Sequence, residues 1–470
     1  MEKLLSLVQT VNSYLSDYVL MILLVGTGIF FTVRTKLIQR HLFYRKDLKK
    51  VIGGVTLNGK RHDSGISSFQ ALCAAVAAQV GTGNIVGASG AILAGGPGAI
   101  FWMWIVAVLG MSTIYAEAVL AQETRIKLPD GEFLGGPVYY IKRAFPNLFG
   151  TCLAVFFACA VIVSLGFIGN MVQANSIGET LHTAVPFLNE KLIGGIIALL
   201  AFAIFAGGIK RIAVVTEKMV PFMALLYIIG GFVILACRIQ YIPETFACIF
   251  KYAFNPEALI GGGLGYALKT AVSQGVKRGL FSNEAGMGST PHAHAQANVE
   301  KPHDQGVVAM WGVLIDTFVV LTMTALVVIS TIYAGDGPLA NATGSNYSEL
   351  LASVGLQKTN LVQIAFSGII GKFGGNLFVA VCLFFFAFST ILGWAFFGKV
   401  NFQYLFGKKS LMVYYLMVAL FIFMGCTLKN DLVWELQDMF NQMMVLPNVI
   451  GLLALSSIVV NLDSRKRITR

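Results

Sequence analysis

The chain has 470 residues, of which 56% are hydrophobic and 12% are charged, and its formal net charge is +11. A soluble protein carries roughly 25% charged residues, so this composition excludes a soluble globular protein and indicates an integral membrane protein. The 7 cysteines are scattered, mostly within apolar runs, and their spacing suggests neither a disulfide framework nor a zinc site.

Apolar segments of about 20 residues recur along the chain, which is the length that a helix needs to cross a hydrocarbon core of about 30 Å. They predict an all-α membrane protein with about 11 transmembrane helices, at residues 12–33, 65–94, 97–121, 151–180, 191–209, 212–237, 257–298, 306–333, 375–400, 410–427 and 441–461. The amphipathic stretch GGPVYYIKRAF (135–145) is expected to rest at the membrane interface.

Lys and Arg gather in alternate loops. The loops 34–61, 122–150, 209–218, 299–305, 399–409 and 462–470 hold 24 of the 34 basic residues, whereas the other loops hold 7. Cytoplasmic loops of membrane proteins are enriched in Lys and Arg, so we expect a plasma-membrane protein with its amino terminus outside and its carboxyl terminus in the cytoplasm. The net charge follows from topology and from attraction to the anionic leaflet, and it predicts no nucleic-acid partner.

Glycines interrupt two of the apolar segments. The first break reads QVGTGNIVGASG at 79–90, and the second segment contains GGGLG at 261–265 and QGVKRGLFSNEAGMG at 274–288. An unwound helix in hydrocarbon leaves N–H and C=O groups unsatisfied, so it persists only where it lines a cavity or meets a ligand. Close packing of small residues such as Gly83 and Gly87 against a neighbouring helix is the alternative explanation.

The two interrupted segments open two halves of the chain. If the first helix is set aside, each half holds five segments, and this odd number makes the halves cross the membrane in opposite senses. Paired broken helices in inverted halves are the best sequence indicator of a transporter's binding site. We divide the chain into an extra helix with a basic loop (1–61), two five-helix repeats (62–240 and 241–461) and a basic tail (462–470).

Three stretches resemble the signature sequences of the alanine or glycine:cation symporter family, which are Na⁺-coupled amino-acid carriers. They read GTGNIVG (81–87), ILAGGPGAIFWMW (92–104) and GLFSNEAGMGSTPHAHA (279–295). The resemblance implies a leucine-transporter-type fold, with one helix ahead of an inverted five-plus-five repeat, that works by alternating access.

The substrate site is expected between the two breaks. Backbone N–H groups of Thr82 and Gly83 suit a carboxylate, because the start of a half-helix presents free donors and a positive dipole end. In the second segment we expect 279–282 to be unwound, so that the backbone around Gly279 and Ser282 meets the substrate ammonium while Phe281 forms a wall or gate. A lipid-facing role is the alternative for Phe281.

Other polar and aromatic residues are candidates for the same pocket. Asn170 and Gln173 share a helix face; the resemblance favours a substrate role for both, although amides such as Asn175 also bond neighbouring membrane helices. Trp394 and Thr390 are expected to bound the space for the substrate side chain.

The resemblance also implies a sodium site at the first break. Carbonyls near Ala77 and Val80, with the Asn84 amide, would coordinate Na⁺, and the hydroxyls of Ser389 and Thr390 would complete its shell. Asn84 could instead cap the outer half-helix, and the hydroxyls could bond back to their own helix.

Several charges lie inside the predicted spans, where charges are usually paired and functional. We expect Glu284 to neutralise Lys277 or Arg278 near the cytoplasmic mouth. A basic loop residue is the expected partner of Glu117, while Asp316 has no evident partner in the sequence. Either acid could carry a proton or assist the ion.

Together these features predict a transporter, not an enzyme, that imports a small neutral amino acid with Na⁺ across the lipid bilayer and needs no organic cofactor. Alanine or glycine is the expected substrate, and glutamine is the alternative substrate. The sequence does not predict the oligomeric state. Proton coupling, a passive channel and a membrane-embedded metal hydrolase using His292 and His294 are the alternatives. GTGNIVG is not a dinucleotide motif, because its third glycine falls one place late and no βαβ unit surrounds it.

Overall fold

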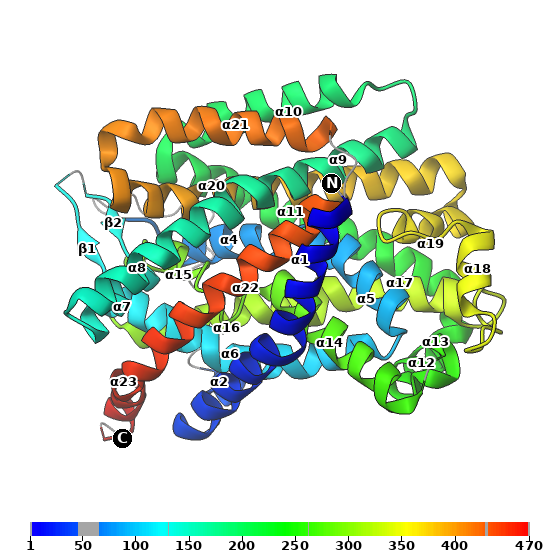
Figure 1. Ribbon diagram of the computed structural model, residues 1–470, viewed down its shortest axis with the longest axis horizontal. Coiled ribbons are helices and arrows are strands. Elements are labelled where there is room, and N and C mark those ends of the chain that lie inside the picture. Colours follow the sequence, from blue (N-terminus) through cyan, green and yellow to red (C-terminus); the bar gives the residue numbers. More distant parts are fainter. Residues whose placement is uncertain (1, 46–64, 130, 262, 428–430, 469–470) are drawn as a thin grey trace.

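A computed structural model describes residues 2–45, 65–129, 131–261, 263–427 and 431–468. Most of the basic loop predicted between 34 and 61, and the end of the basic tail, lie outside the described residues. The chain is built almost wholly of helices that run roughly along the long axis of the molecule (Figure 1). Within the described ranges its single sheet pairs β1 (Ile126–Lys127) with β2 (Phe133–Leu134) in antiparallel fashion.

The first part of the chain forms these helical elements in order: α1 (Glu2–Tyr14), η1 (Leu15–Leu20), α2 (Met21–Arg34), η2 (Ile38–Phe43), α4 (Ser68–Gln79), η3 (Gly83–Gly87), α5 (Ala88–Gly95), α6 (Ala99–Thr124), α7 (Pro137–Ala144), α8 (Leu148–Val161), η4 (Ile162–Gly169), α9 (Asn170–Ala184), α10 (Glu190–Phe205) and α11 (Gly208–Cys237). The segments η1, η3 and η4 are π-helical, whereas η2 is a 3₁₀ helix.

The second part continues with η5 (Ile239–Tyr241), α12 (Ile242–Phe254), α13 (Glu257–Ile260), α14 (Leu264–Asn283), α15 (Pro291–His294), α16 (Pro302–Val313), η6 (Leu314–Leu321), α17 (Thr322–Val328), η7 (Ile329–Tyr333), α18 (Tyr347–Val354), α19 (Leu361–Ile370), α20 (Lys372–Phe406), η8 (Lys408–Ser410), α21 (Leu411–Thr427), α22 (Asp431–Ala454) and α23 (Ser456–Ile468). Here η6 and η7 are π-helical.

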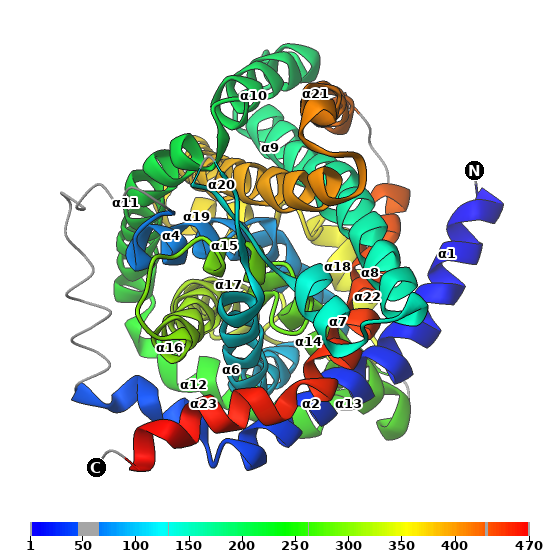
Figure 2. The ribbon, with the colours of Figure 1, turned by 90° about the vertical axis from the view of Figure 1, so that its left-hand side faces the viewer.

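The short helices gather at the two ends of the bundle. Figure 1 shows α12, α13, α18 and α19 at one end, and the β1–β2 hairpin, α7 and the carboxyl terminus at the other. The view along the bundle in Figure 2 places α10 and α21 together on the rim and α4 and α20 further inside. The predicted amphipathic stretch is the separate helix α7.

The predicted number of spans is not confirmed. In the described parts of the chain, 7 helices are long and apolar enough to cross a membrane, or 9 when each of two bent pairs is counted as one span. Two expected spans fall outside this set: α10 has only 16 residues, and α14 carries the basic residues Lys269, Lys277 and Arg278. The helix α22 also begins ten residues before the predicted span at 441–461.

The first predicted break is confirmed. The helix α4 starts with a capping box between Ser67 and Gln70 and ends at Gln79. The next helical segment, Gly83–Gly95, is bent by 47° from it. Val80 and Gly81 between them are not helical, as the glycine-rich sequence predicts, whereas Thr82 already has helical backbone angles.

The second break lies further along the chain than predicted. Residues 279–282 are helical within α14, and the helix ends at Asn283, followed by Glu284 in the left-handed region with φ 58°. Gly286 and Gly288 also have positive φ values of 96° and 78°, which glycine adopts readily. The expectation of an unwound stretch at 279–282 is therefore wrong.

Close helix packing explains Gly275 but not Gly279. A Cβ atom added to Gly275 would lie 2.6 Å from the Trp102 side chain, whereas one on Gly279 would lie at an ordinary contact distance of 3.6 Å from Met103 Cα. Gly275 therefore allows the close approach of α14 to α6.

Candidate functional site

Two hydroxyls on α20 meet the carbonyls at the end of α4. The Thr390 hydroxyl lies 3.0 Å from the Ala77 carbonyl oxygen and 3.4 Å from that of Val80, and the Ser389 hydroxyl lies 3.1 Å from the Ala77 oxygen. All four residues are buried. The tertiary structure thus brings two helices more than 300 residues apart in sequence into one cluster of oxygen atoms.

Both hydroxyls also bond back to their own helix, as the alternative interpretation expected. Ser389 and Thr390 lie 2.8 and 3.1 Å from the Phe386 carbonyl oxygen. A hydroxyl has one proton to donate and two lone pairs that accept. Each hydroxyl can therefore donate its proton to its own helix and still coordinate a cation through a lone pair of its oxygen.

Glycines at the first break are required by the approach of two other helices. A Cβ atom on Gly81 would lie 2.3 Å from the Thr390 hydroxyl oxygen, and one on Gly83 would lie 3.0 Å from Ser282 Cα. No side chain larger than hydrogen fits at Gly81 without displacing Thr390. The break and the close packing are thus both present, and the two explanations do not exclude each other.

Thr82 and Gln173 are in direct contact. The Thr82 backbone N–H donates to the Gln173 side-chain oxygen at 3.1 Å, so an amide oxygen stands where a substrate carboxylate was predicted. Within the described residues, the Thr82 hydroxyl and the Asn170 side-chain oxygen are buried without a hydrogen-bond partner. Asn175 instead donates to the Gly425 carbonyl on the neighbouring α21 at 3.2 Å.

Aromatic rings lie beside this group. Phe281 and Trp394 contact each other edge to face, with ring centroids 6.0 Å apart, and Trp434 lies 5.8 Å from Phe281 on another side. Phe281 is only 4% exposed, which excludes the lipid-facing role. The sequence interpretation missed Trp434, because it placed 428–440 in a loop, although α22 begins at Asp431.

Glu284 does not neutralise the basic residues of α14, as had been expected. Its carboxylate accepts hydrogen bonds from the Trp394 indole N–H and, at 2.5 Å, from the Ser289 hydroxyl. The reason is local: Glu284 follows the end of α14, where the left-handed backbone turns the chain away from Lys277 and Arg278.

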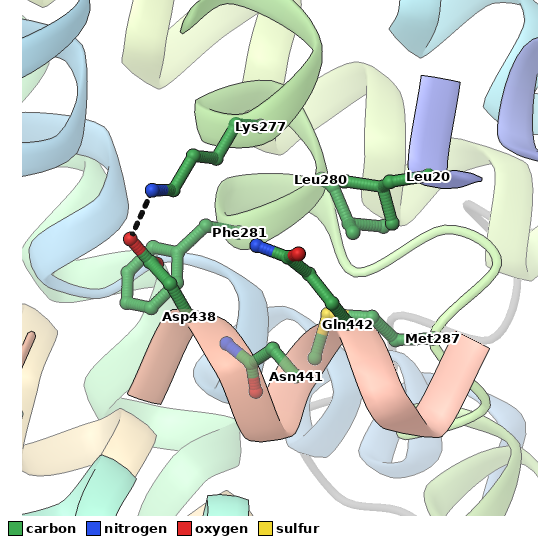
Figure 3. A pocket seen from close by; sticks show the side chains of 8 residues that line it. All are labelled: Leu20, Lys277, Leu280, Phe281, Met287, Asp438, Asn441 and Gln442. Carbon is green, nitrogen blue, oxygen red and sulfur yellow. Dashed lines mark ion pairs between the residues drawn. The ribbon is translucent and has the colours of Figure 1, made fainter. Parts of the chain in front are cut away.

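The basic residues pair with an acid that the sequence interpretation overlooked. Lys277 Nζ lies 2.8 Å and Arg278 Nη2 lies 3.1 Å from Asp438 Oδ2 on α22. Figure 3 shows the Lys277–Asp438 pair next to Phe281 in a small pocket between α14 and α22. We call Lys277, Arg278 and Asp438 the ion triad.

Lys277 also lines a cavity of about 350 Å³ with residues that include Gln9 and Asn12 of α1 and Tyr266 near the start of α14. Lys277 therefore lines both this cavity and the smaller pocket that Phe281 lines.

Asn84 belongs to a group other than the predicted sodium ligands. Its side-chain oxygen accepts from the Gly81 N–H at 3.0 Å, within the break, while its NH₂ donates to Asp316 at 2.7 Å. Asn84 is therefore not the cap of the outer half-helix, whose N-cap residue is Thr82. The Asp316 carboxylate also accepts from the hydroxyls of Ser282 and Thr317. Asp316 thus has partners, and they come from both broken helices.

The remaining buried acid and the histidines are held by hydrogen bonds. Glu117 accepts from the Gly288 N–H at 2.9 Å and the Asn448 amide at 2.6 Å, so the expected basic partner is wrong. His292 contacts Asn401, and His294 contacts Gln305. No group of three or more His, Cys, Asp or Glu residues that could hold a metal occurs in the described residues.

A family model described as the sodium:alanine symporter family matches residues 1–465. The chain belongs to this family. The resemblance found in the signature stretches is thereby confirmed, and the protein is a multi-pass membrane transporter that couples amino-acid transport to sodium; its relatives named below are symporters, not enzymes.

Two relatives illustrate the range of the family. The sodium/alanine symporter AgcS of Methanococcus maripaludis is 42% identical over 97% of this symporter and 96% of its own length. The probable sodium/glutamine symporter GlnT of Bacillus subtilis is 37% identical over 95% of this symporter and 87% of its own length.

A solved structure shows the same fold. The crystal structure of MhsT in complex with L-phenylalanine superposes with a TM-score of 0.58 at 14% sequence identity, covering 84% of this symporter and 89% of MhsT. At this identity the similarity shows the fold alone, and it confirms the leucine-transporter-type fold class.

Proposed function

We propose that this family member carries a small neutral amino acid, alanine or glycine, into the cell together with Na⁺ by alternating access. The convergence of the Ala77 and Val80 carbonyls with the Ser389 and Thr390 hydroxyls carries the proposal. The same break, at Val80 and Gly81, also leaves the Thr82 N–H free to donate to a side chain, that of Gln173. Ion and substrate would therefore bind to two sides of one unwound segment.

The sodium ion is cargo, and the oxygen cluster fits it. The Thr390 hydroxyl lies within 3.4 Å of both carbonyl oxygens, and the Ser389 hydroxyl lies 3.1 Å from that of Ala77. Unwound backbone carbonyls are the ligands that Na⁺ takes in transporters of this kind. Ala77, Val80, Ser389 and Thr390 would bind the ion, whereas Asn84 would not.

The substrate carboxylate would take over the hydrogen bond of the Thr82 N–H from Gln173. The unpartnered Thr82 hydroxyl and the oxygen of Asn170 then provide further polar contacts. The substrate ammonium group would bind to the last turn of α14 around Phe281 and Ser282. Carbonyls at a helix end lack intrahelical donors and lie at the negative end of the helix dipole.

The aromatic rings restrict the size of the substrate. Phe281, Trp394 and Trp434 pack together beside the break, and such a wall leaves room for a short side chain only. The name of AgcS supports alanine, whereas the name of GlnT makes glutamine the competing substrate to test. The inverted five-helix halves and an amino terminus outside the cell are part of the same proposal.

Uptake into proteoliposomes tests the proposal. Labelled alanine, glycine and glutamine are offered under an inward Na⁺ gradient, under an inward proton gradient with choline in place of Na⁺, and with no gradient. We expect concentrative uptake of alanine or glycine with Na⁺ alone. Uptake driven by protons without Na⁺ would establish the proton-coupled alternative, and equilibrating uptake that ignores both gradients would indicate a channel.

A further inference from the structure

Glu117 on α6 is fully buried, and no ion pair among the residues that the structure describes includes it. Its two carboxyl oxygens have different surroundings. Oε1 accepts hydrogen bonds from the Gly288 N–H at 2.9 Å and from the Asn448 amide at 2.6 Å, whereas Oε2 is buried without a hydrogen-bond partner. An acid inside a membrane protein without a cationic partner is expensive and is by default a functional site.

Two other buried acids have donors on both oxygens. The Glu284 carboxylate accepts from the Trp394 indole on Oε1 and from the Ser289 hydroxyl on Oε2. The two oxygens of Asp316 each lie 3.0 Å from the Ser282 hydroxyl, and each has a further donor. This arrangement suits an ionised carboxylate, which only accepts hydrogen bonds and does so through both oxygens.

The one-sided arrangement at Glu117 suits a neutral carboxylic acid instead. An ionised Glu117 would place a charged oxygen in the interior with no donor facing it, and an unpaired buried charge costs far more than an unpaired neutral polar group. A proton on Oε2 removes this charge. Oε1 is then the carbonyl oxygen, which accepts both N–H bonds through its two lone pairs.

Glu117 holds the second break against α6. The Asn448 amide that donates to Glu117 also donates to the Gly286 carbonyl at 2.8 Å, and the Asn448 oxygen accepts from the Tyr140 hydroxyl on α7. Gly286 and Gly288, whose φ values are positive, both belong to the chain that follows α14. A change in the charge of Glu117 would therefore act directly on this break.

The neighbouring elements offer an acid and neutral rings to Glu117. The titratable side chains on the described elements around this part of α6 are Tyr140 on α7, Glu284 after α14, His292 and His294 on α15, and His303 on α16. Both imidazoles of α15 accept a hydrogen bond from a side-chain amide, so neither is doubly protonated. The helices α2 and α22 present Leu24 and Asn448 at the second break.

The basic side chains of these helices are engaged elsewhere. Lys142 and Arg143 of α7 are exposed, and Lys277 and Arg278 of α14 pair with Asp438. Loss of the proton would thus set a charge on Glu117 against the Glu284 carboxylate without a basic side chain of α7 or α14 to offset it.

We propose that Glu117 is a proton-binding site, which holds a proton on Oε2 in this conformation and releases it when the second break moves away from α6. In the release step the Oε2–H bond breaks, the proton passes to water that the movement admits, and the carboxylate keeps the electron pair. This proton is distinct from the Na⁺ and the amino acid of the proposed function. Alkaline conditions therefore disfavour this conformation and slow transport.

The pH dependence of uptake provides the first test. Na⁺-driven uptake of labelled alanine is measured at a series of pH values, with the same pH on both sides of the proteoliposome membrane. We expect wild-type uptake to fall toward alkaline pH, by up to about tenfold per pH unit, which is the limit for one proton. Glu117→Gln keeps the Oε1 acceptor and cannot ionise, so its uptake should lack this alkaline decline.

Tyr140→Phe is the control for the uptake test, because it removes the neighbouring phenol and leaves Glu117 in place. This variant should keep the wild-type pH dependence. A decline in Glu117→Gln as steep as that of the wild type would overturn the proposal, and so would its loss in Tyr140→Phe alone.

Infrared spectroscopy of the purified, full-length protein provides a second test that needs no transport. A protonated carboxylic acid has a C=O stretching band that an ionised carboxylate lacks. The difference between the wild type and Glu117→Gln at neutral pH should contain this band, whereas the difference between the wild type and Glu284→Gln should contain carboxylate bands only. Carboxylate bands alone in the Glu117→Gln difference, or the same bands in both differences, would overturn the proton site.

Discussion

The indole N–H of Trp394 donates a hydrogen bond to the carboxylate of Glu284, the first residue after the end of α14. This bond joins the middle of α20 to the second break and holds the indole ring against Phe281. Space for the ring comes from Gly169, whose added Cβ atom would lie 2.6 Å from it. A wall of the proposed pocket is therefore fixed by a residue that does not itself line it.

Glu284→Ala should lower stability and relax the substrate size limit. It leaves the Trp394 N–H and the Ser289 hydroxyl without their buried acceptor, at about 1–3 kcal/mol per group. Glu284→Gln keeps an acceptor oxygen, so it should lower stability less and relax the substrate size limit less than Glu284→Ala. The melting temperature and the competition of valine with labelled alanine are the measurements; equal competition by valine in wild type and Glu284→Ala would contradict the positioning role.

Gly81→Ala should lower Na⁺-driven uptake by roughly 10- to 100-fold, since displacements of about 1 Å at a site have effects of this size. The added methyl group would have to push the Thr390 hydroxyl away from the carbonyls of α4. Gly90→Ala is the matched control, because its Cβ atom would meet only Lys358 at an ordinary 3.8 Å. A loss of the same size in both variants would show that general damage to the helix pair is responsible.

Thr82→Val should separate binding from folding. The change removes a buried hydroxyl that has no partner among the described residues, so the melting temperature should stay the same or rise, because an unsatisfied buried hydroxyl is itself unfavourable by about 1–3 kcal/mol. Alanine binding should weaken, and Thr82→Ser should restore it. Wild-type affinity in Thr82→Val, measured by calorimetry in saturating Na⁺, would remove this hydroxyl from the substrate site.

Asp438→Asn should strongly reduce both stability and uptake. It leaves the charges of Lys277 and Arg278 without their buried counter-ion, and breaking a buried pair on one side is destabilising by about 3–5 kcal/mol. Glu435 lies one turn away on α22, where its carboxylate accepts a hydrogen bond from the Asn12 amide, so Glu435→Gln should affect both quantities little. Comparable melting temperatures for the two variants would contradict a structural role of the ion triad.

The glycines of the sequence predict the position of the first break correctly and that of the second break wrongly. At Val80 and Gly81 the glycine-rich sequence, the helix end and the bend coincide, so the local sequence predicts the break correctly. At 275 the glycine allows α14 to approach α6, while the positive φ angles fall at 284, 286 and 288. Glycine serves both purposes, and only the presence of a neighbouring helix distinguishes them.

The partners of the buried charges were likewise not predictable from the sequence. Lys277 and Arg278 were recognisable as intramembrane charges, yet their partner is Asp438, some 160 residues away on a helix whose start was misplaced. Glu284 is closer in sequence but points the other way, because its left-handed backbone reverses the chain. Sequence spacing predicts which residues share a helix face, but not how a helix is rotated against its neighbours.

The sequence by itself determined the membrane class, the family, the first break and the candidates Thr82, Gln173, Ser389 and Thr390. Hydropathy, helix-breaking residues and signature motifs are local properties of the chain, so no contact is needed to read them. Only the tertiary structure decided where the second break lies and which acid pairs with Lys277 and Arg278. It also decided that Asn84 and Ser282 meet at Asp316. These outcomes depend on how helices far apart in the sequence are rotated and packed against each other. Their side chains form hydrogen bonds only where the surfaces of two helices are in contact.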